Sequence, residues 1–152
     1  MKLRNAILFS VMSMISFNSF GESQTDVVKS QLNAINRVAV SQGLIPTDEF
    51  MIDDMENNGS TAWTFNVGPN RIAVIHLVCD NNCRDISAMV YGSDGNMILN
   101  TDTMDDDGKP DVWVLPVKNT NNSMAKAIVT VKMNKCYAQS CIYGMSIAEK
   151  PL

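Results

Sequence analysis

The chain has 152 residues, of which 12 are basic and 16 are acidic, and its formal net charge is −4. This acidic balance argues against nucleic-acid binding, because phosphate groups are bound by clustered Lys and Arg side chains. The length suits one domain with one hydrophobic core.

A secretory signal is predicted at the N-terminus. Lys2 and Arg4 precede a largely apolar run over 6–17, and Ser19-Phe20-Gly21 carries small residues where a signal peptidase prefers them. A membrane span needs about 20 predominantly apolar residues, and this stretch is shorter and interrupted by serines. We therefore expect residues 1–21 to be cleaved, with an uncleaved anchor as the alternative. Residues 22–152 would form a single periplasmic domain without a membrane span, with 10 basic and 16 acidic residues and a net charge of −6.

The first mature segment has a helical pattern. Its apolar residues Val28, Leu32, Ile35 and Ala39 fall on one face, so a helix is predicted over 24–42. Thr25 or Asp26 can cap its start and Gly43 can end it. Such a helix packs on a core or mediates contact in a homodimer. Residues 44–60 are mixed, and Thr47-Asp48-Glu49 is a candidate start for a short helical turn.

Most of the remaining chain has strand patterns. Seven apolar or alternating runs are separated by turn residues and lie at 61–67, 71–79, 86–91, 97–100, 112–117, 126–134 and 142–148. The second run is apolar on both faces, which indicates a central strand, and Pro116 indicates an edge strand or a strand end. Asp94-Gly95 predicts a hairpin turn. The fold class is therefore mainly β: an antiparallel sandwich of about seven or eight strands over 60–149, with an N-terminal α-helix and two disulfides.

The disulfides follow from an even number of cysteines in an exported chain. Their spacing favours two local pairs, Cys79 with Cys83 and Cys136 with Cys141. Each pair lies between two strand-like runs, so we expect each bond to staple a hairpin. A zinc site of four thiolates is the alternative, and export disfavours it.

The order of motifs from about residue 59 onward resembles a known family. The motifs are Cys79-Asp80-x-x-Cys83-x-Asp85-Ile86, a strand ending in Val90-Tyr91, Asp94-Gly95, Asp102, Asp106, Lys109-Pro110-Asp111-Val112, Met133-x-x-Cys136 and Cys141-x-Tyr143-Gly144. They resemble the small β-sandwich domains related to the bacterial pre-peptidase C-terminal family, in their periplasmic, disulfide-bearing form. The resemblance implies a binding or accessory module. Where that family often has Asp-Leu-Asp-Leu, this chain has Asp85-Ile86-Ser87-Ala88 and lacks the second acidic residue.

In size, export and disulfides the chain also resembles periplasmic immunity proteins of type VI-secreting bacteria. These protect the cell from its own effectors, and some inhibit lysozyme-like wall hydrolases.

Enzymatic motifs are not found, and we do not expect catalysis. The one histidine, His76, which a Ser-His-Asp triad would have to use, lies within an apolar strand run, where a packed or hydrogen-bonded side chain is the usual interpretation. The acidic loop offers Asp102, Asp105, Asp107 and Asp111 as oxygen ligands for calcium. The loop does not fit the EF-hand register, and a solvated acidic turn is the alternative. No other cofactor is expected.

The two cysteine loops are the predicted partner-binding residues. A short closed loop loses little entropy on binding, and Tyr is a frequent interface anchor. The residues proposed for contact are Asp80, Asn81, Asn82, Tyr137 and Gln139. We expect an immunity protein that binds a basic, secreted peptidoglycan-degrading effector and blocks its active-site cleft, because an acidic inhibitor is steered toward a basic partner. The alternative is a pre-peptidase-like accessory module, calcium-stabilised or metal-free, with no toxin partner.

Overall fold

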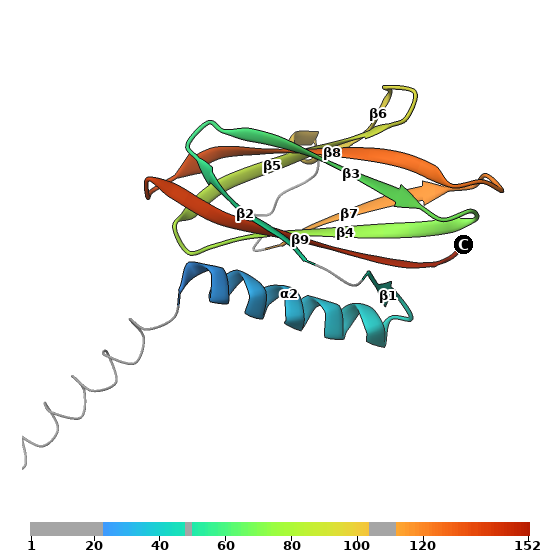
Figure 1. The fold of residues 1–152 in the computed structure, drawn as a ribbon, viewed down its shortest axis with the longest axis horizontal. Helices are drawn as coiled ribbons and strands as arrows, with labels where there is room; N and C mark the ends of the chain where they lie inside the picture. Colours follow the sequence, from blue (N-terminus) through green and yellow to red (C-terminus); the bar gives the residue numbers. More distant parts are fainter. Residues whose placement is uncertain (1–22, 48–49, 104–111) are drawn as a thin grey trace, which may run out of the picture.

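A computed structural model describes residues 23–47, 50–103 and 112–152 (Figure 1). Two antiparallel sheets stack face to face, and one helix lies against the outer face of one of them. The elements are α2 (Gln24–Ser41), β1 (Ile45–Pro46), β2 (Met51–Glu56), β3 (Ser60–Val67), β4 (Arg71–Cys79), β5 (Cys83–Gly92), β6 (Met97–Asn100), the short 3₁₀ helix η1 (Thr101–Thr103), β7 (Val112–Asn119), β8 (Ala125–Cys136) and β9 (Ser140–Pro151). The predicted fold class is confirmed.

The strands form two sheets that each contain segments far apart in the sequence. Sheet A has the order β1-β9-β4-β7, with β2 also pairing with β9, and sheet B has the order β3-β8-β5-β6. The predicted central strand, β4, is hydrogen-bonded to β9 on one side and to β7 on the other. β7 is an edge strand, as Pro116 predicts. The Asp94-Gly95 turn joins β5 to β6, and Gly95 has a φ of 80°, a conformation that glycine adopts without strain.

The main core fills the space between the sheets. Alternate residues of each strand point inward, so the period of two in the sequence becomes a buried row. In β8 this row is Ala127, Val129, Val131 and Met133, as the alternation predicts. Tyr143 of β9 is also buried here, and its hydroxyl accepts a hydrogen bond of 2.9 Å from Trp63 Nε1 across the sandwich.

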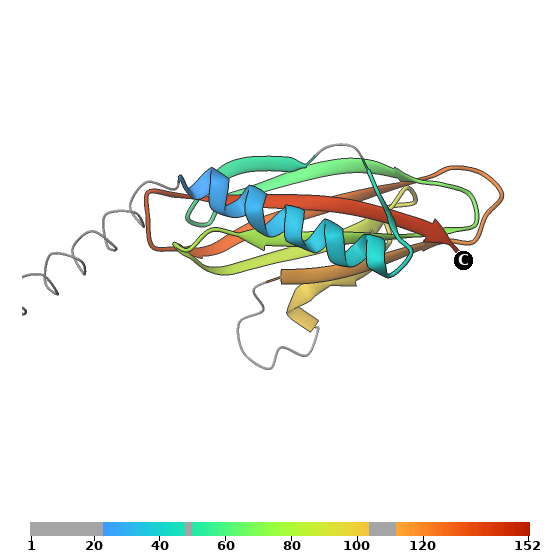
Figure 2. The same cartoon turned by 90° about the horizontal axis from the view of Figure 1, so that it is seen from below.

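The helix packs along β9 and β4 on the outer face of sheet A (Figure 2). Its N-cap is Ser23, two or three residues before the predicted Thr25 or Asp26, because the Ser23 hydroxyl accepts a bond from the Asp26 backbone N–H at 3.1 Å. Gly144 of β9 lets the helix approach closely. A Cβ there would lie 2.6 Å from Val28 Cγ1 and 2.8 Å from Leu32 Cδ1, closer than carbon atoms pack.

Strands β1 and β2 occupy the segment that the sequence leaves unassigned. β2 pairs with β9 over Met51–Glu56 and forms an edge of sheet A, so the sandwich starts before residue 60. Asp53 and Asp54 interrupt its apolar pattern, and such charges are typical of an edge strand. Because of this interruption, the sequence pattern does not predict the strand. The candidate turn after Thr47 falls mostly on 48–49, outside the described residues.

The predicted signal segment, residues 1–21, also lies outside the described residues. Within the described ranges, no helix is long and apolar enough to cross a membrane. The two disulfides indicate maturation in an oxidising compartment.

Candidate functional site

The two disulfides pair as the spacing predicts, Cys79 with Cys83 and Cys136 with Cys141. This pairing excludes a zinc site of four thiolates. The expectation that each bond staples a hairpin is wrong. β4 belongs to sheet A and β5 to sheet B, while β8 belongs to sheet B and β9 to sheet A. Each bond therefore holds an arch where the chain crosses between the sheets, and the strands it connects are not hydrogen-bonded to each other.

The two arches lie side by side at one end of the sandwich. Cys83 and Cys136 are opposite each other in the β5–β8 ladder. The Tyr137 backbone N–H donates a hydrogen bond of 2.9 Å to the Asn82 carbonyl. We call residues 79–85 and 134–141 together the disulfide end. The two loops, which are separate contact elements in the sequence, form one surface in the fold.

Asp80 is the internal support of the first arch. It is 4% exposed, and its two carboxylate oxygens accept three backbone hydrogen bonds. Oδ1 accepts from Asn82 at 2.9 Å and Cys83 at 3.2 Å, and Oδ2 accepts from Ile142 at 2.6 Å. Bonds to a carboxylate are stronger than bonds between neutral groups, so they fix the loop and join it to β9. Among the predicted contact residues, this burial leaves Asn81, Tyr137 and Gln139 as the exposed ones and Asn82 as partly exposed.

Tyr137 is the most prominent apolar group of the disulfide end. Its side chain is 62% exposed. Arg84 Cζ lies 5.0 Å from the centre of its ring and Lys135 Nζ lies 5.2 Å from it, both within cation–π range. Two cations therefore flank the exposed ring, and Asp80 and Asp85 balance their charge within the disulfide end.

Arg84 and Lys135 are not predicted as contact residues from the sequence, because both stand at unspecified positions of the quoted motifs. Register shifts around Asp85 interrupt the β5–β8 ladder next to both residues. Such bulges redirect side chains, and a one-residue irregularity of this kind has no signal in the sequence.

Two other elements brace the disulfide end. Asn57, in the turn between β2 and β3, accepts a hydrogen bond from the Cys136 backbone N–H at 2.9 Å. Gln24, at the start of α2, accepts one from the Asn81 backbone N–H at 3.3 Å. The arches are therefore held by the disulfides and also by hydrogen bonds from their backbone to side chains of α2 and of the β2–β3 turn.

The calcium prediction falls largely outside the described residues. Asp105, Asp107 and Asp111 lie there, while Asp102 is an exposed residue of η1 whose backbone N–H donates to Asn100 Oδ1 at 3.0 Å. The described ranges hold no group of three or more His, Cys, Asp or Glu residues placed to bind a metal ion. The calcium site stays a prediction.

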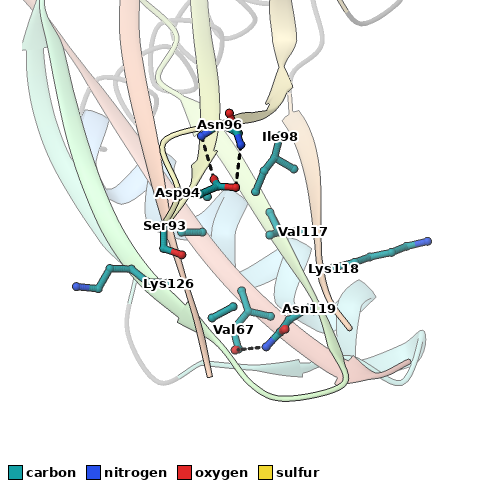
Figure 3. Close-up of a pocket in the computed structure, with 12 residues that line it drawn as sticks. Val67, Ser93, Asp94, Asn96, Ile98, Val117, Lys118, Asn119 and Lys126 are labelled. Atoms are coloured by element: carbon teal, nitrogen blue, oxygen red, sulfur yellow. Dashed lines mark hydrogen bonds between the residues drawn. The ribbon is translucent and has the colours of Figure 1, made fainter. Parts of the chain in front are cut away.

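A pocket of about 220 Å³ lies at the opposite end of the sandwich (Figure 3). Its polar groups bond to one another. Asn96 donates to both oxygens of Asp94 at 2.9 Å and thereby lowers the pKa of that carboxyl, and Asn119 Nδ2 donates to the carbonyls of Val67 and Gly68. Lys118 and Lys126 extend away from the pocket in opposite directions. Because the internal bonds use these groups, the pocket offers little for orienting a ligand, and we favour the disulfide end.

Comparison with protein-family models gives no match for this chain, and no curated protein matches it.

Proposed function

We propose that the protein is a periplasmic immunity protein that binds a secreted peptidoglycan-degrading effector and blocks its active-site cleft. The observation that supports this proposal most is the convergence of the two disulfide arches on one end, with Tyr137 projecting from it. A fixed, protruding tip has the shape required to enter a concave active site. The proposed contact surface is Tyr137 with Asn81, Asn82 and Gln139 around it.

Rigidity favours this tip as a binding element. Association costs free energy for every loop and side chain that must become ordered, and a loop that is already ordered avoids most of that cost. Here each arch is closed by a disulfide, and the Asp80 carboxylate accepts three backbone bonds. Tyr137 adds a large ring at the centre, and Tyr residues in such positions often dominate binding energy.

The two cations beside the Tyr137 ring suit the active site of a wall hydrolase. Glycoside hydrolases cut their substrates with a pair of carboxylic side chains, so their clefts carry negative charge. Arg84 and Lys135 stand beside Tyr137 and would meet these carboxylates when the ring enters the cleft. At longer range, a mature net charge of −6 would steer the protein toward an effector with a basic surface.

Co-expression tests the proposal directly. The product of the adjacent gene is exported to the periplasm with and without this protein, and cell lysis is followed. We expect wild-type protein to prevent lysis and Tyr137→Ala to protect poorly. Met124→Ala is the matched control, because Met124 is also 62% exposed but lies in the β7–β8 loop at the opposite end. Lysis despite wild-type protein would refute the immunity function. Full protection by Tyr137→Ala would refute only the assignment of the tip.

The second candidate function is a pre-peptidase-like accessory module without a toxin partner. The sandwich of two antiparallel sheets supports it, because the resemblance from residue 59 onward implies such a fold. In its calcium-stabilised form, the melting temperature should rise with added calcium and fall with a chelator. A melting temperature that is the same in both would exclude that form.

A further inference from the structure

The contact between α2 and sheet A is interrupted by a polar patch. Val78 of β4 belongs to an apolar cluster with the first half of the helix, and Val74 packs in a second cluster with its last turn and β9. His76 lies between them on the same face of β4. Its partner across the ladder is Ser146 of β9. The two side chains are 8% and 2% exposed, so the patch is almost fully buried beneath the helix.

The polar atoms in this layer are not satisfied by the described residues. His76 Nδ1 and Ser146 Oγ are buried without a hydrogen-bond partner there. Gln31 Oε1 and Asn36 Oδ1, on the two sides of the apolar stripe of α2, are also buried without one. Buried polar groups that lack partners weaken the contact that contains them, so the helix is held less firmly at its middle than at its two apolar clusters.

His76 is the titratable group that this interface buries. On the outer face of sheet A, the residues around His76 are apolar or neutral. They are Val74 and Val78 from β4, Val112, Val114 and Pro116 from β7, Gly144 and Ala148 from β9, and Ile52 from β2. The charged residues of the surrounding elements stand apart. Asp26, Lys29 and Arg37 are on the exposed side of α2, Asp54 and Glu56 are exposed on the β2 edge, and Lys118 and Lys150 are exposed at the far ends of β7 and β9. No carboxylate among the described residues is therefore placed to compensate a charge on His76.

We propose that α2 is a pH-sensitive cover, which leaves sheet A when His76 takes up a proton. A charged imidazolium in this layer would be largely shielded from water and would have no counterion among the described residues, and burying a charge in that way is unfavourable. Opening of the helix supplies water. The inter-sheet core contains no residue of α2, so the sandwich can persist while the helix is released.

The direction of the effect follows from the environment of His76. Burial lowers its pKa from the ordinary value of 6.5 in the closed state, while the open state restores that value. Below pH 6.5 the open state binds more protons than the closed state, so the closed state loses stability as pH falls toward the lowered pKa. One proton taken up on opening raises the opening constant by at most about tenfold per pH unit. Above pH 6.5 the opening constant should be independent of pH.

Amide hydrogen exchange of the exported protein tests the cover. Protection of the amides of 24–41 is measured from pH 7.5 to 5.0 and corrected for intrinsic exchange. This pH range lies above the ordinary pKa values of carboxyl groups, so those groups stay charged throughout. We expect the opening constant of the helix to rise several-fold below pH 6.5. Amides of β5 and β8, in sheet B, should show no matching change.

Two substitutions separate the titration from packing. His76→Phe should abolish the pH dependence of helix opening. If the phenylalanine variant does not fold, His76→Gln serves as the test in its place. Ser146→Ala removes a buried hydroxyl that has no partner among the described residues. This variant should therefore lower the opening constant of the helix at every pH and leave its dependence on pH unchanged. The proposal is overturned if wild-type protection does not fall below pH 6.5, if the slope persists in the His76 variants, or if sheet B opens together with the helix. None of these readouts depends on an effector, so they are independent of the proposed function.

Discussion

Replacing Asp80 by Asn tests whether its carboxylate supports the disulfide end. The substitution keeps the shape and removes the charge. An amide has one oxygen, so it can continue to accept from Asn82 and Cys83 or from Ile142, but it must turn an N–H₂ group toward the remaining backbone N–H. At least one hydrogen bond is therefore lost, and in its place the amide N–H₂ faces a backbone N–H, so that two donors meet. The hydrogen bonds that remain are weaker, because their acceptor no longer carries a charge.

The expected loss of stability is large for an isosteric change. Hydrogen bonds to charged groups contribute about 1.5–3 kcal/mol each, and an unsatisfied buried donor costs about 1–3 kcal/mol. We therefore expect the free energy of unfolding to fall by about 2–4 kcal/mol for Asp80→Asn. The assay is urea unfolding followed by circular dichroism, under conditions that keep both disulfides oxidised.

Asp85→Asn is the matched control. Asp85 is exposed two residues beyond Cys83 and accepts a single bond of 3.2 Å from the Asn134 side chain, so its loss should change stability little. A drop of less than about 1 kcal/mol for Asp80→Asn would refute the reasoning, because the three backbone bonds would then be shown to contribute little. Equal losses in both variants would show that net charge, and not the position of Asp80, is responsible.

Three further predictions concern packing, cross-linking and charge. Gly144→Ala should lower stability by about 1–3 kcal/mol through overpacking, and adding Val28→Ala should restore part of it; thermal unfolding of the single and double variants measures both. Replacing Cys136 and Cys141 by Ser should cost about 2 kcal/mol in urea unfolding, since the closed loop is short, and a loss near zero would contradict the entropic account. If the tip enters a carboxylate-lined cleft, Arg84→Glu should reduce protection in the co-expression assay without changing the melting temperature, and unimpaired protection would exclude that contact.

The sequence by itself determined the local features of this protein. Alternation of apolar residues placed β3 and β8, the apolar stripe of Val28, Leu32, Ile35 and Ala39 placed α2, and Asp94-Gly95 placed a turn. The spacing of the cysteines gave both disulfide pairs. These features depend on the intrinsic periods of helix and strand and on contacts a few residues apart, and such properties are encoded in short segments.

The tertiary structure alone decided which strands pair and what the loops present. β4 and β5 are adjacent in sequence but enter different sheets, because each buries its inner row against the opposite layer, and this turns the expected hairpins into arches. The same arrangement buries Asp80, places Arg84 and Lys135 beside Tyr137, and brings His76 beneath the helix. These positions depend on contacts between residues tens of positions apart, whose pairing is selected by the packing of the whole core and not by any local pattern.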